Sequence, residues 1–300
     1  MTGSPIVPRI WLDDQAEKAA DVYRAAFGGG SVDAVAHYPA SAPNPSGRPP
    51  GSVLTVDLTV AGQRFTLLNA GPAFTVNPSI SFFVFLPSAT EVDGHYHALV
   101  DGGMALMALD AYPWSERYGW VQDRFGVSWQ VMAVPGAERA TVAPCLMFTG
   151  NQHGRAREAI DAYVAAFPGS SVDVVDTHDG SEGPAGTVKH GRFVLAGQPM
   201  AAMDSAHEHG FAFNEAVSLQ VMCADQDEVD RLWSRLGKGG EYGPCGWLKD
   251  RFGVSWQVVP EALAAWLTSP DVAGRERTFA AMLEMGKLDV EALQRAYDGG

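Results

Sequence analysis

The sequence predicts an α+β protein built from two tandem copies of one unit, followed by a helical C-terminal extension. Residues 119–131 (GWVQDRFGVSWQV) and 246–258 (GWLKDRFGVSWQV) are identical at eleven of thirteen positions, which indicates a duplication. Segments in which apolar residues recur every second position, typical of strands, alternate with segments of helical spacing. The length of 300 residues fits two domains.

Weaker similarities extend the repeat over most of the chain. Residues 16–27 resemble residues 156–167, with Tyr and Phe at matching places. The spacing between the copies shortens along the chain because the first copy contains an extra Pro- and Ser-rich loop, Pro39–Gly51, which is unsuited to a helix or strand. We therefore expect a first domain at residues 1–136, a second at 140–262 and a helical extension at 263–300.

The first half of the first copy reads as strand, helix and three strands. Ile6–Leu12 is a short apolar strand, and Asp13 or Asp14 is the candidate N-cap of the helix that follows. The helix, Gln15–Phe27, has apolar residues at helical spacing and stops at a run of three glycines. The strands expected after it are Val32–Tyr38, Val53–Val60 and Arg64–Leu68, with a hairpin turn at Gly62-Gln63.

The same pattern then restarts, so each copy contains two βαβββ modules and the chain contains four. A strand is expected at Ile80–Leu86 and a helix at Ala89–Val100. The strands that complete the second module are Met104–Ala108, Gly119–Gln122 and Val127–Ala133. After the second copy, three segments have amphipathic helical spacing: Leu263–Leu267, Arg275–Met285 and Val290–Tyr297.

Composition excludes several classes of function. The formal charge of −14 and the lack of any Lys/Arg run argue against nucleic acid as a partner. Three cysteines without CxxC spacing indicate neither a disulfide framework nor a zinc site, and favour a reducing compartment. No 18-residue apolar run and no secretory leader pattern occur, so we expect a cytoplasmic protein with no membrane partner.

The doubled βαβββ pattern and several motifs resemble the vicinal-oxygen-chelate superfamily, which includes glyoxalase and bleomycin-resistance proteins. The motifs include WLDDQAEKAA at 11–20, LNAGPAF at 68–74, YPWSERYGWVQDRFGVSWQ at 112–130 and CGWLKDRFGVSWQVVP at 245–260. Within it, they are most similar to the PhnB-like branch, often labelled 3-demethylubiquinone-9 3-methyltransferase. The resemblance covers about residues 5–134 and 141–298, and it implies tandem glyoxalase-like domains, each an open barrel formed from two modules. Pairing of modules within each copy, which would make the chain an intrachain pseudo-dimer, is the default expectation, and a homo-oligomer stays open.

The resemblance also implies a place for a divalent metal, held by His, Glu or Gln from the first and last strands of each module. In the first copy these places fall near Val7–Arg9, Phe65–Leu67, Ser79 and Gln130, and in the second near Val142–Pro144, Met200–Ala202, Ala216 and Gln257. One Gln in four positions, twice, is too few donors for a cation. The eight histidines do not form an H-x₃-H motif with a carboxylate and read as solvated surface residues. The sequence therefore predicts no metal and no cofactor.

Polar residues in the last strand of each copy are the first candidates for a ligand site. Ser128 and Gln130 alternate with apolar neighbours and should face the cavity, as should Ser255 and Gln257 in the second copy. The alternative is that the glutamines satisfy buried backbone groups. Trp11, Tyr112, Trp114, Tyr118 and Trp120 form an aromatic group in the first copy; Trp11, Trp114 and Tyr118 are the pocket candidates. Because the second copy lacks most of them, we expect the first copy to hold any ligand.

Three functions fit these observations. The first is a binding protein for a small apolar or oxygenated molecule in a metal-free cavity; the second is an enzyme of the superfamily, of lyase, dioxygenase or isomerase type; the third is an assembly role for the C-terminal helices. The helices more simply pack over the second domain. Methyl transfer has no support, because a Rossmann-type site needs a Gly-rich loop before a helix. The segments Gly28–Gly30 and Gly237–Gly240 both follow helices.

Overall fold

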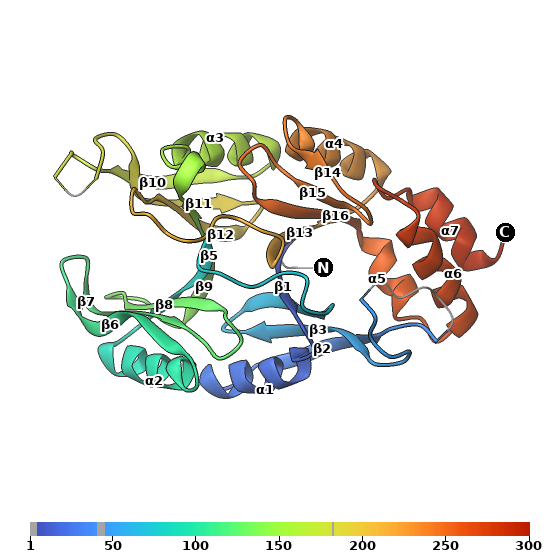
Figure 1. Ribbon diagram of the computed structural model, residues 1–300, viewed down its shortest axis with the longest axis horizontal. Coiled ribbons are helices and arrows are strands. Elements are labelled where there is room, and N and C mark those ends of the chain that lie inside the picture. The colour runs from blue at the N-terminus through green and yellow to red at the C-terminus, as the bar shows by residue number, and fades with distance from the viewer. Residues whose placement is uncertain (1–4, 41–45, 182) are drawn as a thin grey trace.

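The computed structural model describes residues 5–40, 46–181 and 183–300, so residues 41–45 of the Pro- and Ser-rich loop lie outside it. Four βαβββ modules follow one another, and a helical tail closes the chain (Figure 1). Module 1 contains β1 (Ile6–Leu12), α1 (Ala16–Ala26), β2 (Ser31–His37), β3 (Val53–Val60) and β4 (Gln63–Asn69). Module 2 contains β5 (Ile80–Leu86), α2 (Ala89–Val100), β6 (Met104–Tyr112), β7 (Ser115–Gln122) and β8 (Ser128–Ala133).

The second copy repeats this order with a shorter last hairpin. Module 3 contains β9 (Thr141–Phe148), the 3₁₀ turn η1 (Gly150–Gln152), α3 (Ala156–Ala166), β10 (Ser171–Thr177), β11 (Val188–Leu195) and β12 (Gln198–Asp204). Module 4 contains β13 (Val217–Cys223), α4 (Gln226–Gly237), β14 (Glu241–Tyr242), β15 (Trp247–Lys249) and β16 (Ser255–Pro260). The tail contains α5 (Glu261–Leu267), α6 (Val272–Leu283) and α7 (Val290–Asp298). No helix in the described ranges is long and apolar enough to cross a membrane.

The strands form two eight-stranded sheets, and each sheet combines one module from each copy. Sheet A has the order β14-β15-β16-β13-β1-β4-β3-β2, and sheet B has the order β10-β11-β12-β9-β5-β8-β7-β6. Both are open, because their end strands do not pair to close a barrel. In Figure 1, sheet B occupies the left half of the molecule and sheet A the right half.

The expected pairing of modules within each copy is therefore wrong. Strand β1 pairs antiparallel with β13, with Arg9 opposite Ser218, and β5 pairs antiparallel with β9, with Ser81 opposite Cys145. The first strand of every module is apolar and offers a similar edge. Alternation in sequence specifies which face of such a strand is buried but leaves its partner open.

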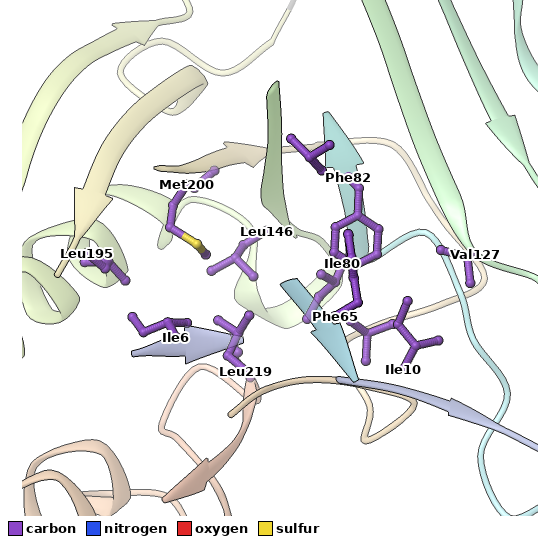
Figure 2. Close-up of a cluster of buried hydrophobic side chains, with 14 of the residues drawn as sticks. Ile6, Ile10, Phe65, Ile80, Phe82, Val127, Leu146, Leu195, Met200 and Leu219 are labelled. Carbon is purple, nitrogen blue, oxygen red and sulfur yellow. The ribbon is translucent and has the colours of Figure 1, made fainter. Parts of the chain in front are cut away.

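A shared hydrophobic core lies between the two sheets and the helices. Figure 2 shows Ile6 and Leu219 from sheet A close to Leu146 and Met200 from sheet B, with Phe65 and Phe82 beside them. These side chains come from alternate positions of their strands, so one face of each sheet points into this core. The two sheets consequently stand back to back, and their other faces point away from this core.

The two modules of one copy are joined through a buried carboxylate rather than through a sheet. In the turn between β7 and β8, Asp123 accepts hydrogen bonds from Tyr23 Oη on α1 and from Trp129 Nε1, both at 2.9 Å. The backbone N–H groups of Phe125 and Val127 donate to its other oxygen. Asp250 makes the equivalent four bonds in the second copy. These turns give the repeated DRFG motif its structural role.

The C-terminal tail packs on sheet A. Leu263, Leu288 and Leu293 are buried together with Met222 of β13 and Val259 of β16. At its other end, Glu276 Oε1 on α6 accepts from the backbone N–H of Ala40, in the connection between β2 and β3 of module 1, at 3.2 Å. The tail therefore spans from module 4 to module 1 across sheet A, on the right in Figure 1. This supports packing over the protein's own second half as the role of its apolar residues.

Most expected elements lie where the sequence placed them, and one cap is different. Strands β1, β3 and β5 and helix α2 have the expected bounds. Helix α1 has Gln15, not Asp13 or Asp14, at its N-cap, and no side chain of its own caps it. Instead, Asn69 Oδ1 at the end of β4 accepts from the N–H of Ala16 at 2.8 Å. A cap supplied from 53 residues away leaves no local signal.

Candidate functional site

Each sheet has a distal face, defined here as the face directed away from the shared core. On sheet B this face carries Ser81, Phe83, Cys145, Ser128 and Gln130, which alternate with core residues along their strands. On sheet A it carries the positions that match them in register: Ser218, Gln220, Arg9, Ser255 and Gln257. The molecule thus has two equivalent candidate sites on opposite sides.

The distal face of sheet B is mainly apolar and aromatic. Phe83 and Cys145 lie at its centre and are 4% and 0% exposed. Partly buried side chains pack around them: Phe85, Met107, Tyr112, Trp120, Met132 and Met203. At the rim, Trp114 stacks on Tyr112 with ring centroids 4.9 Å apart, yet is 52% exposed. The face offers apolar contact area that the protein itself leaves partly uncovered.

The polar atoms of this face are satisfied by one another. Tyr118 Oη donates to Gln130 Oε1 at 2.7 Å, and Gln130 Nε2 donates to Ser81 Oγ at 2.8 Å. Trp120 Nε1 donates to Ser128 Oγ at 2.7 Å. Burial raises the pKa of Tyr118, which keeps its hydroxyl protonated as the donor. A ligand on this face therefore meets few unsatisfied polar groups.

Two titratable groups on this face are neutral at pH 7. Burial raises the pKa of the Cys145 thiol to about 12, although a hydrogen bond with Ser81 opposes the shift. The thiol therefore lacks the thiolate character of a nucleophile. Burial lowers the pKa of His190, and the charge of Arg192 lowers it further. The His190 ring meets the edge of Phe83 at a centroid distance of 5.5 Å, so a neutral imidazole borders the apolar centre.

The distal face of sheet A is centred on a guanidinium. Arg9 Nη1 donates to Gln257 Oε1 at 2.5 Å, and Gln257 Nε2 donates to Ser218 Oγ at 2.9 Å. Burial lowers the pKa of Arg9 while Asp57 opposes the shift, and a guanidinium stays charged at neutral pH. Asp57 accepts from Thr66 Oγ1 at 2.7 Å. Across the described ranges, no ion pair joins Asp57 to Arg9.

Three polar atoms of this face are shielded from solvent and have no hydrogen-bond partner in the part of the chain that the structure describes. They are Arg9 Nε, Gln220 Oε1 and Ser255 Oγ. Among the described residues, Gln220 Nε2 contacts only the weakly accepting sulfur of Met222, at 2.8 Å. Arg9 lies opposite Ser218, which lies opposite Ser255, so the three unsatisfied groups form one patch across β1, β13 and β16. Buried polar groups without a hydrogen-bond partner are rare in folded proteins, so three in one patch require an explanation.

The structure divides the predicted pocket residues between the two faces. Sheet B holds Trp114, Tyr118, Ser128 and Gln130, whereas sheet A holds Trp11, Ser255 and Gln257. The sequence predicted that Trp11 would group with the other aromatic residues of the first copy. In the structure it lies apart from them. Its ring lies 4.8 Å from Phe74 and 6.2 Å from Trp247, and its Nε1 donates to the carbonyl of Gly71. Because modules pair between copies, neither face belongs to the first copy alone.

Neither face fits the divalent metal that the superfamily resemblance implies. At the equivalent first-strand positions stand the Arg9 guanidinium and the Cys145 thiol, which burial keeps protonated. The guanidinium would repel a cation, and amide and hydroxyl groups alone hold one weakly. Nowhere in residues 5–40, 46–181 and 183–300 do three or more His, Cys, Asp or Glu side chains gather as a metal site would require.

Sequence reasoning missed four residues of these faces: Arg9, Phe83, His190 and Gln220. Arg9 carried a usable signal, since it is the only charged side chain in the strand Ile6–Leu12. Phe83 and Gln220 occupy matching places in the fifth strand and its copy, but one is apolar and the other polar. His190 was assigned to the solvated surface, whereas it is partly buried beside Phe83.

Comparison with known proteins finds one protein family that matches both copies of the repeat. The model of the family described as 3-demethylubiquinone-9 3-methyltransferase matches residues 4–132 and again residues 140–259. A PhnB protein from Bacillus cereus is 29% identical over 43% of this chain and 98% of its own, with a TM-score of 0.38. No protein of curated function matches the chain significantly.

Longer structures resemble the whole tandem arrangement. Glyoxalase I from Zea mays covers 86% of this chain and 94% of its own at 10% identity, with a TM-score of 0.54. A candidate dioxygenase from Bacillus subtilis covers 97% and 94% at 12% identity, with a TM-score of 0.50. At such identity these likenesses concern the fold alone.

Proposed function

The chain belongs to the 3-demethylubiquinone-9 3-methyltransferase family, a PhnB-like branch of the vicinal-oxygen-chelate superfamily, and from this premise we propose that it binds a small, neutral, largely apolar molecule on the distal face of sheet B. One observation carries the proposal. This face combines partly exposed aromatic and Met side chains with polar groups that already bond to one another. Such a surface favours ligands that bring apolar area and few charges.

The electrostatics of the face favour a neutral ligand. Cys145 and His190 are uncharged at pH 7 because burial disfavours their charged forms. A charged ligand would lose its hydration without gaining a partner at the centre of the face. Met107, Met132 and Met203 add flexible apolar side chains that adapt to ligands of different shape.

Methyl transfer, the activity in the family's description, receives no support from the arrangement of glycines. Gly28–Gly30 follow α1, and Gly239 follows α4. A cofactor-binding loop of the Rossmann type precedes its helix and presents backbone N–H groups to the ligand. The descriptions of the maize and Bacillus subtilis proteins concern those proteins, and at their low identity they carry no reaction over to this chain.

Fluorescence titration with the neutral probe N-phenyl-1-naphthylamine tests the proposal. We expect saturable enhancement with the full chain, and Phe83→Ala should weaken binding about tenfold because it removes a central aromatic anchor. Trp114→Ala at the rim should have a smaller effect. Gln220→Ala is the matched control, since Gln220 occupies the position of Phe83 on sheet A.

The unfolding temperature of each variant, measured in parallel, separates loss of the site from loss of the fold. Saturable probe binding that Phe83→Ala leaves unchanged, while Gln220→Ala weakens it, would move the apolar site to sheet A. Absence of saturable binding by the folded wild-type chain would reject the proposal.

A further inference from the structure

We propose that the distal face of sheet A is a second, separate site that binds a small hydroxycarboxylate anion through Arg9, Ser255 and Gln220. The site goes beyond the apolar site of sheet B and shares no residue with it. It rests on the three shielded polar atoms that the protein leaves without partners: Arg9 Nε, Ser255 Oγ and Gln220 Oε1.

The positive charge of Arg9 defines the sign of the ligand. Arg9 bonds to Gln257 through one nitrogen and leaves Nε free in the shielded part of the face. Two further cations lie on this face: Lys249, which is paired with Glu215 at 2.6 Å, and Arg64, which stands two residues before Thr66 on β4. The carboxylate of Asp57 acts on Arg9 through its charge but bonds to Thr66, so the shielded guanidinium gains from an anion that bonds to it directly. Arginine matches the planar geometry of a carboxylate particularly well.

The two neutral groups narrow the class of anion. Ser255 is 1% exposed and can donate its hydroxyl proton to a carboxylate oxygen. Gln220 Oε1 can only accept, so the ligand must also carry a donor close to its carboxylate. An ammonium donor would be repelled by Arg9, whereas a hydroxyl would not. A carboxylate with a neighbouring hydroxyl therefore complements all three groups.

The two sheets differ in whether the serine at this position has a hydrogen-bond partner. On sheet B, Ser128 accepts from Trp120 Nε1. On sheet A the equivalent Trp247 packs edge to face with Trp11, and Ser255 Oγ keeps no partner within the described residues. Arg9, Trp11 and Gln220 retain partial exposure, so the patch stays reachable from solvent beneath the tail.

Isothermal titration calorimetry of the full chain with sodium glycolate tests the site, and acetate and glycine serve as comparison ligands. We expect saturable glycolate binding. Acetate, which lacks the hydroxyl, should bind about tenfold more weakly, and the ammonium group of glycine should weaken binding at least as much. Ser255→Ala should weaken glycolate about tenfold without lowering the unfolding temperature, because its hydroxyl has no partner in the free protein.

Ser128→Ala is the matched control, and we expect it to leave glycolate binding unchanged. Arg9→Met should abolish binding, and Gln220→Leu should remove the preference for glycolate over acetate. If Arg9→Met does not fold, glycolate binding by Ser255→Ala, Ser128→Ala and Gln220→Leu still tests the proposed site. No saturable heat with glycolate, or equal losses in Ser255→Ala and Ser128→Ala, would overturn the assignment. Naphthylamine binding by the same variants reports on sheet B independently.

Discussion

Sheet A and sheet B have the same arrangement of strands, and each has a buried glutamine at the matching position. The residue that donates a hydrogen bond to this glutamine differs between the sheets. On sheet B, Gln130 accepts from Tyr118 and donates to Ser81. On sheet A, Gln257 accepts from Arg9 and donates to Ser218. The donor therefore comes from β7, a last-hairpin strand, on one sheet and from β1, a first strand, on the other.

This difference in donors depends on two positions at which the two sheets carry different residues. The place of Arg9 on sheet A is taken on sheet B by Cys145, since both lie opposite the equivalent serines. In the repeat, the place of Tyr118 is taken by Cys245, whose backbone N–H donates to Met285 in the tail. The first exchange makes sheet A cationic and leaves sheet B neutral, and the second gives sheet A a contact with the tail where sheet B has the Tyr118 hydroxyl.

Placing the sheet A cation on sheet B should have the largest effect. Cys145→Arg buries a guanidinium where Tyr118 already occupies Gln130 Oε1, and it should lower the free energy of unfolding by about 3–5 kcal/mol. Arg9→Cys, the reverse change, leaves Gln257 without its donor and should cost about 1–3 kcal/mol. Urea-induced unfolding at pH 7 compares the two. Equal costs would contradict the asymmetry between the sheets.

Loosening the tail should affect sheet A selectively. Leu288 is 0% exposed and packs with Met222 and Val259, so Leu288→Ala should lower the free energy of unfolding by about 2–4 kcal/mol. Hydrogen exchange should rise in β13 and β16 and stay unchanged in β5 and β8. Exposed Met104 provides the control, because Met104→Ala should change neither. A uniform rise over both sheets would show that the tail supports the whole core.

A smaller effect should appear in the pH dependence of stability. The Cys145 pKa rises from 9.0 to about 12 on folding, so the unfolded chain loses this proton at lower pH than the folded chain. The stability linked to Cys145 is present below pH 9 and falls by on the order of 1 kcal/mol per pH unit as pH rises toward 12. Thermal unfolding of wild type and Cys145→Ala between pH 7 and 11 should diverge from about pH 9. Parallel curves would contradict the buried, neutral thiol.

Much of the fold was predictable because it depends on local pattern. Strict alternation placed β3, and helical spacing between recognisable ends placed α2. The duplicated signature also marked Ser128 and Gln130 as neighbours on one face of their strand, and Ser255 and Gln257 as neighbours on the matching face of theirs. Each of these features is encoded within a dozen residues.

The pairing of modules and the centre of sheet A were not predictable in the same way. Four similar first strands allow several pairings, and the choice depends on contacts between segments far apart, such as β1 against β13, where Arg9 lies opposite Ser218. Arg9 is not a metal donor, so the superfamily resemblance assigns it no role. Its importance follows from what surrounds it, which is Gln257 from 248 residues later in the chain.

The exchange of modules between copies has a consequence for how this sequence can change over generations. Each candidate site has one wall encoded by the first repeat and one by the second. A recombination event that makes the two repeats more alike would therefore rewrite one wall of both sites at once. Specialisation of the two sites requires the repeats to diverge, and the exchange of Arg9 for Cys145 and of Tyr118 for Cys245 is the visible trace of that divergence.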